Sequence, residues 1–295
     1  MEFGLREFVE LRKLIYAKSG IHLGDEKVYF LKRRVEKRME KLGIEDPEEY
    51  LSYLRFFDRQ GRELQELIEE VAVNETYFFR EFPQLQAFAE HCLPDVLERK
   101  KKGLLNTRLR LLSAGCSTGE EAYTLAIILR EMVEGVDSLL AKIVAVDIDR
   151  KALDRALLGI YDTRSIRDVP RVYLERYFDN LGNGTYRVKN TLRDLVTFKQ
   201  VNLADRDEVL SLGISSFDFI FCRNVLIYFS DEIRRKVVEN FYLMLQPGGY
   251  IFLGHSESLS RISTAFALRR MGGYLVYQKP ENADASSPLR EAGVQ

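Results

Sequence analysis

The segment 109–129 constrains the fold of this 295-residue chain more than any other part of it. It reads LRLLSAGCSTGEEAYTLAIIL, which is an apolar strand, a loop of small residues and an amphipathic helix. A second apolar strand, IVAVD, follows and ends at Asp147. Such a loop lets the backbone approach a ligand, and an acid at the next strand tip can accept hydrogen bonds from ribose hydroxyls. The pattern predicts a nucleoside-binding α/β domain and leaves open whether the ligand is NAD, a nucleotide or S-adenosylmethionine (SAM).

The chain around this segment alternates strands with helices from about residue 106, which predicts a parallel sheet. We expect strands at 108–113, 142–147, 195–200, 217–222, 249–254 and 273–278, and helices near 119–132, 149–158 and 231–245. The stretch 160–194 is irregular and contains the turn sequence GNG, so we expect a small antiparallel β insertion there. The polar segment 281–295 lacks periodicity and is predicted to be a disordered tail.

The first 70 or so residues have the periodicity of helices. Phe8, Leu11 and Ile15 share one face of a first helix, and a second is expected at 25–42. Two more are expected, starting at the sequence DPEE and at Arg62. We therefore predict three parts, which are an all-helical domain at 1–72, linker helices at 73–105 and an α/β domain at 106–280.

Composition limits the compartment and the partners. The net charge is −1, so the whole-chain balance does not favour nucleic acid as a partner. No run approaches 18 apolar residues, which argues against membrane insertion. Cys92, Cys116 and Cys222 are far apart and have no metal-site spacing, as expected for buried thiols in a reducing cytosol. We expect a cytoplasmic monomer that holds no metal.

The helix after the small-residue loop begins with Glu120 and Glu121. The loop does not match GxGxxG, and two acids at a helix N-terminus repel a pyrophosphate that would otherwise bind there. They favour a cationic or zwitterionic ligand, which SAM is. The alternative is ordinary helix capping by Thr118 or Glu121.

Polar residues follow several of the predicted strands, where ligands of α/β sheets bind. Asp147 is placed to hold ribose hydroxyls, whereas Asp149 is expected to cap the next helix. Asn202 and Leu203 follow another strand, where an amide and an apolar side chain suit an adenine ring. A turn role for Asn202 is the equal alternative.

Two further segments point to the same crevice. Arg223 and Asn224 end the strand FDFIFC, and Tyr228 follows within reach of a substrate. The segment NETYFFR links the two domains, and on a helical turn its Thr76 and Arg80 would share a face. An arginine at this place is suited to clamping the carboxylate of an amino acid.

The second helix carries an excess of one charge. Residues 27–41 hold seven basic residues against two acidic ones. Lysines and arginines at 32, 33, 34, 37, 38 and 41 form a basic face, which predicts docking of an acidic partner. The alternative is a solvated surface helix. Nucleic acid is a poorer fit, because interleaved aromatic residues are missing.

At these residues the sequence resembles the CheR family of chemotaxis receptor glutamate O-methyltransferases. The matching motifs are NETYFFRE (74–81), SAGCSTGEEAYTLA (113–126), VDID (146–149), FCRNVLIYF (221–229) and GGYIFLGHSESL (248–259). The resemblance implies a class I SAM-dependent methyltransferase fold, a Rossmann-like doubly wound sheet, with an N-terminal helical domain and a small antiparallel β insertion. It implies SAM as cofactor, S-adenosylhomocysteine as product and a receptor's helical bundle as partner.

The resemblance also assigns roles to individual residues. It places Arg80 and Tyr228 nearest the transferred methyl group and the basic face at Arg33, Arg34, Lys37, Arg38 and Lys41 on the receptor. The implied cofactor contacts are Asn74, Thr76, Arg80, Glu120, Glu121, Asp147, Asn202, Leu203, Arg223 and Asn224. Which of the two glutamates faces the cofactor stays open.

One feature departs from some family members. They tether to a receptor's C-terminal peptide through a longer loop, whereas the loop at Gly182–Asn183–Gly184 is short. This favours direct recognition of the receptor bundle. Two other functions are compatible with a SAM-binding domain, and these are methylation of RNA or a small molecule and regulation without turnover. The missing Asn-Pro-Pro-Tyr type motif argues against amino-group methylation, and the intact set of Arg80, Asp147, Asn224 and Tyr228 argues against loss of activity.

Overall fold

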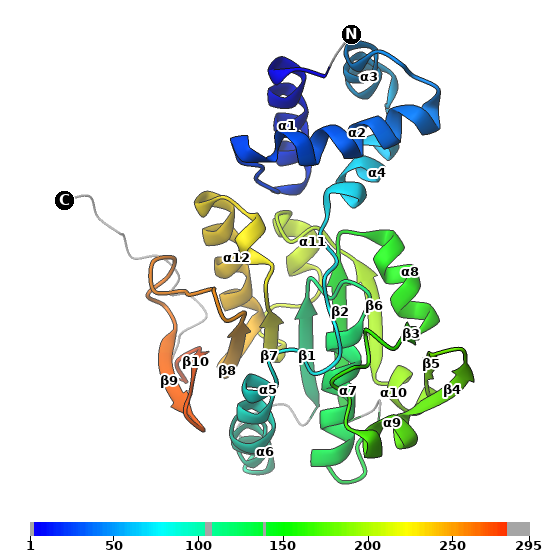
Figure 1. The fold of residues 1–295 in the computed structure, drawn as a ribbon. Coiled ribbons are helices and arrows are strands. Elements are labelled where there is room, and N and C mark those ends of the chain that lie inside the picture. The colour runs from blue at the N-terminus through cyan, green and yellow to red at the C-terminus, as the bar shows by residue number, and fades with distance from the viewer. Residues whose placement is uncertain (1–2, 104–107, 138–139, 282–295) are drawn as a thin grey trace, which may run out of the picture.

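A computed structural model describes residues 3–103, 108–137 and 140–281. A helical domain at the N-terminus lies above an α/β domain, at the end of the sheet where the parallel strands finish (Figure 1). The helical domain contains α1 (Leu5–Ser19), α2 (Val28–Leu42), α3 (Pro47–Ser52) and α4 (Arg62–Val71), with short turns η1 (Asp25–Lys27) and η2 (Tyr53–Phe57).

The helix boundaries follow from local sequence. The helices α1 and α2 end at Gly20 and Gly43, whose φ angles of 74° and 69° are left-handed. Asp46 begins α3 by accepting a hydrogen bond from the N–H of Glu48, and Pro47 occupies the first helical position. The apolar faces of the four helices meet in a core that contains Phe8, Leu11 and Ile15, as predicted.

The second domain is built on a seven-stranded sheet in the order β6-β2-β1-β7-β8-β10-β9. Its strands are β1 (Leu109–Ala114), β2 (Ala141–Asp147), β6 (Val196–Gln200), β7 (Phe217–Cys222), β8 (Leu245–Leu253), β9 (Ala267–Met271) and β10 (Tyr274–Gln278). The first five strands in this order are parallel, and β10 and β9 are antiparallel. The chain runs outward from β1 to β6 and then returns to β7, so strand order reverses between β1 and β7.

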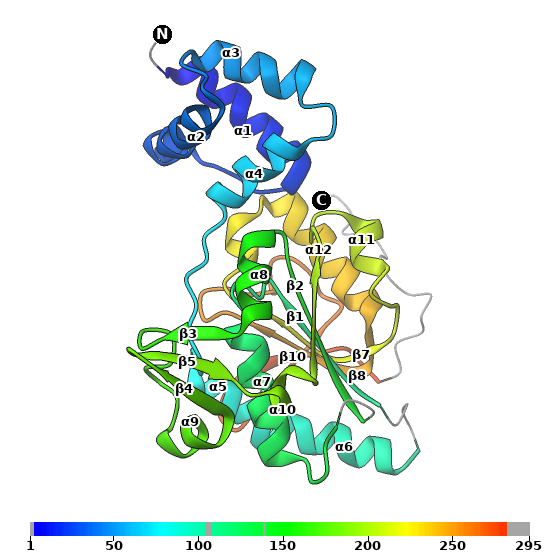
Figure 2. The same ribbon diagram turned by 90° about the vertical axis from the view of Figure 1, so that its right-hand side faces the viewer.

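Helices cover both faces of this sheet (Figure 2). One face packs against α5 (Phe82–Ala87), η3 (Phe88–Cys92), α6 (Leu93–Lys101), α7 (Glu120–Met132), α8 (Arg150–Leu158) and α10 (Asn190–Arg193). The other packs against α11 (Arg206–Leu210) and α12 (Asp231–Met244). Leu111 faces the first layer and Leu112 the second, as the two-residue period of a strand requires. This is the predicted class I methyltransferase architecture.

The insertion is a three-stranded antiparallel sheet in the order β3-β5-β4. It contains β3 (Ile160–Asp162), α9 (Arg171–Tyr177), β4 (Phe178–Gly182) and β5 (Thr185–Val188). Asn183 and Gly184 form the turn with φ angles of 51° and 73°, which suits the right-handed twist of a hairpin. The predicted β insertion and its short turn are confirmed.

Several details differ from the sequence-based expectations. The strand β8 begins at residue 245 instead of 249, and the edge strand β9 was not predicted. The segment 73–81 is an extended linker and turn, so the helical turn assumed for Thr76 and Arg80 is wrong. The predicted tail lies outside the described residues, apart from residue 281. In the described ranges, no helix is long and apolar enough to cross a membrane.

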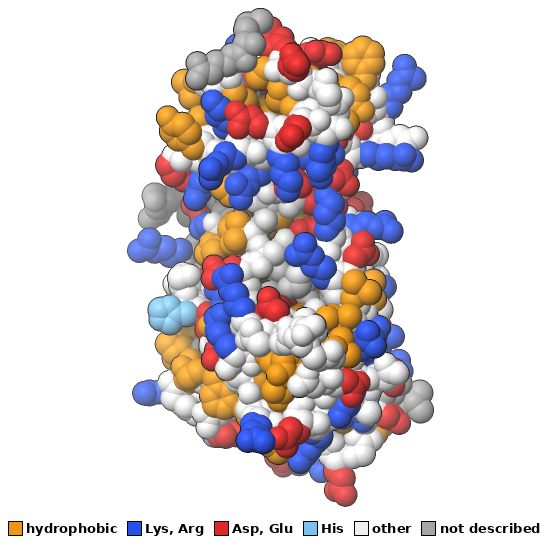
Figure 3. Space-filling model, turned by 45° about the vertical axis from the view of Figure 1, so that its right-hand side comes forward, with side chains coloured by type: hydrophobic (Ala, Val, Ile, Leu, Met, Phe, Trp, Pro, Cys, Tyr) orange, Lys and Arg blue, Asp and Glu red, His pale blue; other side chains and the backbone are white. Residues whose placement is uncertain are grey.

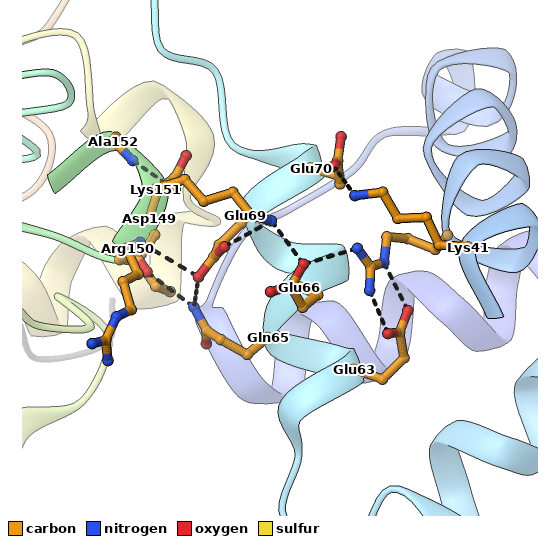
Figure 4. A network of polar contacts seen from close by, with 12 residues as sticks. Lys41, Glu63, Gln65, Glu66, Glu69, Glu70, Asp149, Arg150, Lys151 and Ala152 are labelled. Carbon is orange, nitrogen blue, oxygen red and sulfur yellow. Dashed lines mark hydrogen bonds and ion pairs between the residues drawn. The ribbon is translucent and has the colours of Figure 1, made fainter. Parts of the chain in front are cut away.

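Charged side chains join the helical domain to the sheet domain (Figure 4). The ammonium group of Lys151, in the first turn of α8, lies 2.7 Å from a carboxylate oxygen of Glu66 and 3.1 Å from one of Glu69. Beside them, the side-chain amide of Gln65 donates to the carbonyl of Ile148 at 3.0 Å. The helix α4 is thereby fixed to the loop that follows Asp147.

Candidate active site

A cavity of about 320 Å³ lies at the point where the strand order reverses. This volume is in the range of small-molecule sites. Loops after β1, β2, β6 and β7 line it, together with the linker after α4 and Ile21 after α1. Nearly all the predicted cofactor and catalytic residues line it, and these are Asn74, Thr76, Arg80, Glu121, Asp147, Asn202, Leu203, Arg223, Asn224 and Tyr228.

Asp147 occupies the tip of β2, as predicted. One carboxylate oxygen accepts from the N–H of Ser117 at 2.7 Å, and the other from the N–H of Asp149 at 2.9 Å. Burial raises the pKa of Asp147 to about 6, although these backbone hydrogen bonds oppose the rise. The carboxylate is therefore tied to the small-residue loop and has remaining lone pairs for a ligand.

Asp149 caps α8, as predicted, by accepting from the N–H of Ala152 at 3.1 Å. Its second oxygen accepts from the side-chain amide of Asn74 at 2.6 Å. The amide oxygen of Asn74 in turn accepts from the hydroxyl of Ser117 at 2.9 Å. The linker is thus joined to two of the loops that line the cavity.

Glu121, and not Glu120, faces the cavity. Its carboxylate accepts from the hydroxyl of Ser113 at 2.6 Å and lies 3.3 Å from the guanidinium of Arg223. Burial raises the pKa of Glu121, and the charge of Arg223 opposes that rise. The same guanidinium donates to the carbonyl of Arg80 at 2.5 Å, so Arg223 joins the floor of the cavity to the linker.

Glu120 does not line the cavity, contrary to its inclusion among the cofactor contacts. It is buried beneath the β insertion, where its carboxylate accepts from the hydroxyls of Thr118 at 2.6 Å and Ser165 at 3.1 Å. Neighbouring residues of a helix point about 100° apart, and at this helix start Glu121 lies on the cavity side.

Asn202 lines the cavity, and its side chain is engaged elsewhere. The amide oxygen accepts from the N–H of Ala204 at 3.0 Å, and the amide nitrogen donates to the carbonyl of Lys18 at 2.8 Å. Asn202 therefore has the turn role that was the alternative to binding an adenine ring. Reading of an adenine ring by the Asn202 amide stays a prediction.

Two buried polar atoms at the end of β7 have no protein partner among the described residues. They are the amide oxygen of Asn224 and the Nε of Arg223. Burying an unpaired acceptor is costly, so the amide oxygen is suited to a ligand that donates a hydrogen bond. The amino groups of SAM fit this requirement.

The helical domain contributes to the site, which was not predicted. The N–H of His22 donates to the carbonyl of Tyr228 at 2.8 Å, and Ile21 pairs with Phe229 as an isolated β-bridge. The hydroxyls of Tyr16 and Ser230 hydrogen-bond to each other at 2.9 Å. Since a helix pattern does not say what its end contacts, the sequence held no signal for this.

The basic face of α2 differs from expectation at one position. Arg38 is 5% exposed and makes two hydrogen bonds to Glu63, at 2.9 and 2.6 Å, so it is not available to a partner. Arg33, Lys37 and Lys41 are exposed, and Arg34 is half-buried. Figure 3 shows lysine and arginine side chains gathered in a band near the junction of the two domains.

Comparison with known proteins agrees with this site. The family model described as "CheR methyltransferase, SAM binding domain" matches residues 74–274, and "CheR methyltransferase, all-alpha domain" matches residues 6–72. The chain is 41% identical to chemotaxis protein methyltransferase 2 of Vibrio cholerae, over 93% of each chain.

Two other relatives are similar over most of their length. The chemotaxis protein methyltransferase of Borreliella burgdorferi is 34% identical, over 86% of this chain and 88% of the relative. The chemotaxis protein methyltransferase of Escherichia coli is 34% identical, over 92% of this chain and 89% of the relative. The helical domain, the SAM-binding domain and the cavity between them are therefore those of a SAM-dependent methyltransferase, and the chain belongs to the CheR methyltransferase family.

Proposed function

We propose that the protein transfers the methyl group of SAM to glutamate side chains of chemoreceptors and so forms glutamate methyl esters. The observation that carries the proposal is the pair Arg80 and Tyr228, which line the same cavity as Asp147 and Asn224. A cation and a phenol beside the cofactor site suit an anionic acceptor.

The acceptor chemistry agrees with the residues present. A glutamate with a pKa of about 4.3 is already ionised at neutral pH, so its carboxylate oxygen attacks the methyl carbon without a general base. A C–O bond forms as the C–S bond breaks, and S-adenosylhomocysteine leaves. Among the described residues that line the cavity, none is a histidine.

The protein's contribution is then alignment and exclusion of water. Burial raises the pKa of Tyr228, which keeps its phenol protonated and able to donate to one carboxylate oxygen. Arg80 lines the cavity, and its guanidinium donates to the carbonyl of Glu75 at 2.7 Å. The positive charge of Arg80 favours approach of the glutamate.

The exposed cations of α2 supply the docking surface in this proposal. They lie on the helical domain, which contributes Ile21 to the cavity, and glutamates of a receptor bundle would present negative charge to them. The turn at Asn183 and Gly184 is too short to suggest a tethering loop, which favours direct recognition of the bundle.

The decisive experiment incubates the protein with methyl-labelled SAM and receptor-containing membranes. Label should enter the receptor and be released as methanol by mild base, because carboxyl esters hydrolyse there and methylated amines do not. Membranes that lack receptors are the control. Base-stable label, or label in RNA or small molecules, would contradict the glutamate assignment, and binding without transfer would indicate a regulatory protein.

A further inference from the structure

Glu257 lies in the turn after β8 and does not line the cavity, yet its carboxylate accepts four backbone hydrogen bonds. One oxygen accepts from Asn224 at 2.8 Å and from Gly254 at 2.7 Å. The other accepts from Val225 at 3.0 Å and from Ile227 at 3.2 Å. A single side chain therefore satisfies three N–H groups of the loop that follows β7.

The conformation of this loop depends on such an acceptor. Asn224 is left-handed, with φ at 60°, and Val225 is right-handed, with φ at −119°. Successive residues of opposite hand turn their N–H groups to one side and form a concave anion-binding nest. Asparagine tolerates left-handed backbone better than most residues other than glycine, and here its N–H is held in place by the Glu257 carboxylate.

The end of β8 is shaped to bring Glu257 to this nest. At Gly254 an added Cβ would lie 2.7 Å from the backbone nitrogen of Asn224 and 2.8 Å from a carboxylate oxygen of Glu257. Only glycine permits that approach, because real Cβ atoms do not come so close. The motif GHSE therefore supplies both the space and the acceptor.

The loop held in this way contributes several residues to the cavity lining, among them the predicted site residues Arg223, Asn224 and Tyr228. We infer that Glu257 is a positioning residue, whose carboxylate fixes the loop 223–229 and thereby directs Asn224 and Arg223 to SAM and Tyr228 to the acceptor. The inference rests on cofactor binding and is independent of which acceptor is methylated.

The first test measures SAM binding by calorimetry for Glu257→Gln, well below its melting temperature. The substitution keeps the side chain's size and turns one acceptor into an NH₂ donor facing two N–H groups. Since each unmet buried donor is costly, the Kd for SAM should rise about ten-fold or more. The matched control is Glu232→Gln, an exposed glutamate paired with Lys236, whose Kd should stay within about two-fold of wild type.

The second test is rescue by a small anion. Glu257→Ala leaves the nest open, and formate, but not chloride at equal ionic strength, should restore SAM affinity by filling it. If Glu257→Gln binds SAM within about two-fold of wild type, or only its melting temperature falls, the positioning role is wrong. Since no receptor is present, failure here is distinct from failure of the glutamate assignment.

Discussion

At the scale of single residues, burial makes the Asp147 carboxyl sensitive to pH near 6. It is 8% exposed and carries a pKa raised to about 6, because its charged form has lost water. In the ligand-free protein the folded state binds the proton more tightly than the unfolded state does. The contribution of Asp147 to the free energy of unfolding therefore decreases as the pH rises from about 3.8, the ordinary pKa of an aspartate, to about 6.

SAM binding should show the opposite trend. Ribose hydroxyls donate to a carboxylate, so we expect SAM affinity to weaken as the pH drops through about 6. Asp147→Ala should abolish measurable binding, since the ribose loses both acceptor oxygens. Calorimetry between pH 5 and 8 checks both points, with Asp154→Ala, an exposed residue of α8, as control. An unchanged affinity for Asp147→Ala would remove the ribose role.

Tyr228 belongs to the transfer step and not to cofactor binding in the proposed mechanism. Tyr228→Phe retains the ring and removes the phenol that would orient the acceptor. Turnover should fall about 10- to 100-fold, with the Kd for SAM within about two-fold of wild type. Methyl transfer and binding are measured on the same preparation. Equal turnover in the two proteins would exclude Tyr228 from the site.

The gathering of the predicted polar residues around one cavity could be predicted from the sequence for a physical reason. Parallel strands end at one edge, so polar residues that follow β2, β6 and β7 must gather there. Prediction failed where the partner of a side chain lies far along the chain. Arg38 repeats with the exposed cations of α2, and only its pairing with Glu63 shows that it is buried. Glu257 was missed for the same reason, since its function lies in contacts to a loop about 30 residues away.

At the scale of helices, α4 partly neutralises α2. Lys37 donates to the carboxylate of Glu70 at 2.6 Å, Lys41 lies 3.9 Å from it, and Arg34 donates to its carbonyl at 3.3 Å. Burial acts to raise the pKa of Glu70, and these lysines hold it below its usual value. The proposed docking surface therefore includes the carboxylate of Glu70, which would repel an acidic partner.

Substitutions on this face should act in opposite directions. Arg33→Glu should raise the KM for receptor about three- to ten-fold at low salt, because it repels an acidic partner. Glu70→Gln should lower that KM by removing the carboxylate that Lys37 and Lys41 contact, which leaves both ammonium groups to the partner. The Kd for SAM should not change in either protein. Lys236→Glu on α12 is the charge-matched control, and a KM that is insensitive to Arg33→Glu would indicate a solvated surface helix.

At the scale of the whole molecule, the site is formed by two domains held together. The end of α1 and the residues just after it contact two of the cavity loops, since the carbonyl of Lys18 accepts from Asn202 and the N–H of His22 donates to the carbonyl of Tyr228. Neither contact follows from periodicity, which assigns helices to domains and says nothing of how domains meet. The fold of each domain was predictable from sequence, and their junction was not.

Gly20 offers a test of that junction, with Gly43 as its internal control. Both glycines end a helix with left-handed φ, at 74° and 69°, so replacement by alanine should cost about 1 kcal/mol of unfolding free energy at each. At Gly43 an added Cβ meets nothing within 4 Å, whereas at Gly20 it would lie 2.7 Å from the Cβ of Ala204. Gly20→Ala must therefore move the end of α1 and the loop that carries Asn202 and Leu203 relative to each other.

The two variants should separate stability from binding. Denaturant unfolding is expected to show a loss for both, larger for Gly20→Ala. Calorimetry should show weaker SAM binding, by about three-fold or more, for Gly20→Ala alone, because a shift of a few tenths of an ångström in a binding loop loses contacts. If both variants bind SAM as wild type does, the helical domain covers the cavity without shaping it. A loss of affinity confined to Gly20→Ala would mean that the junction itself sets the geometry of the cofactor site.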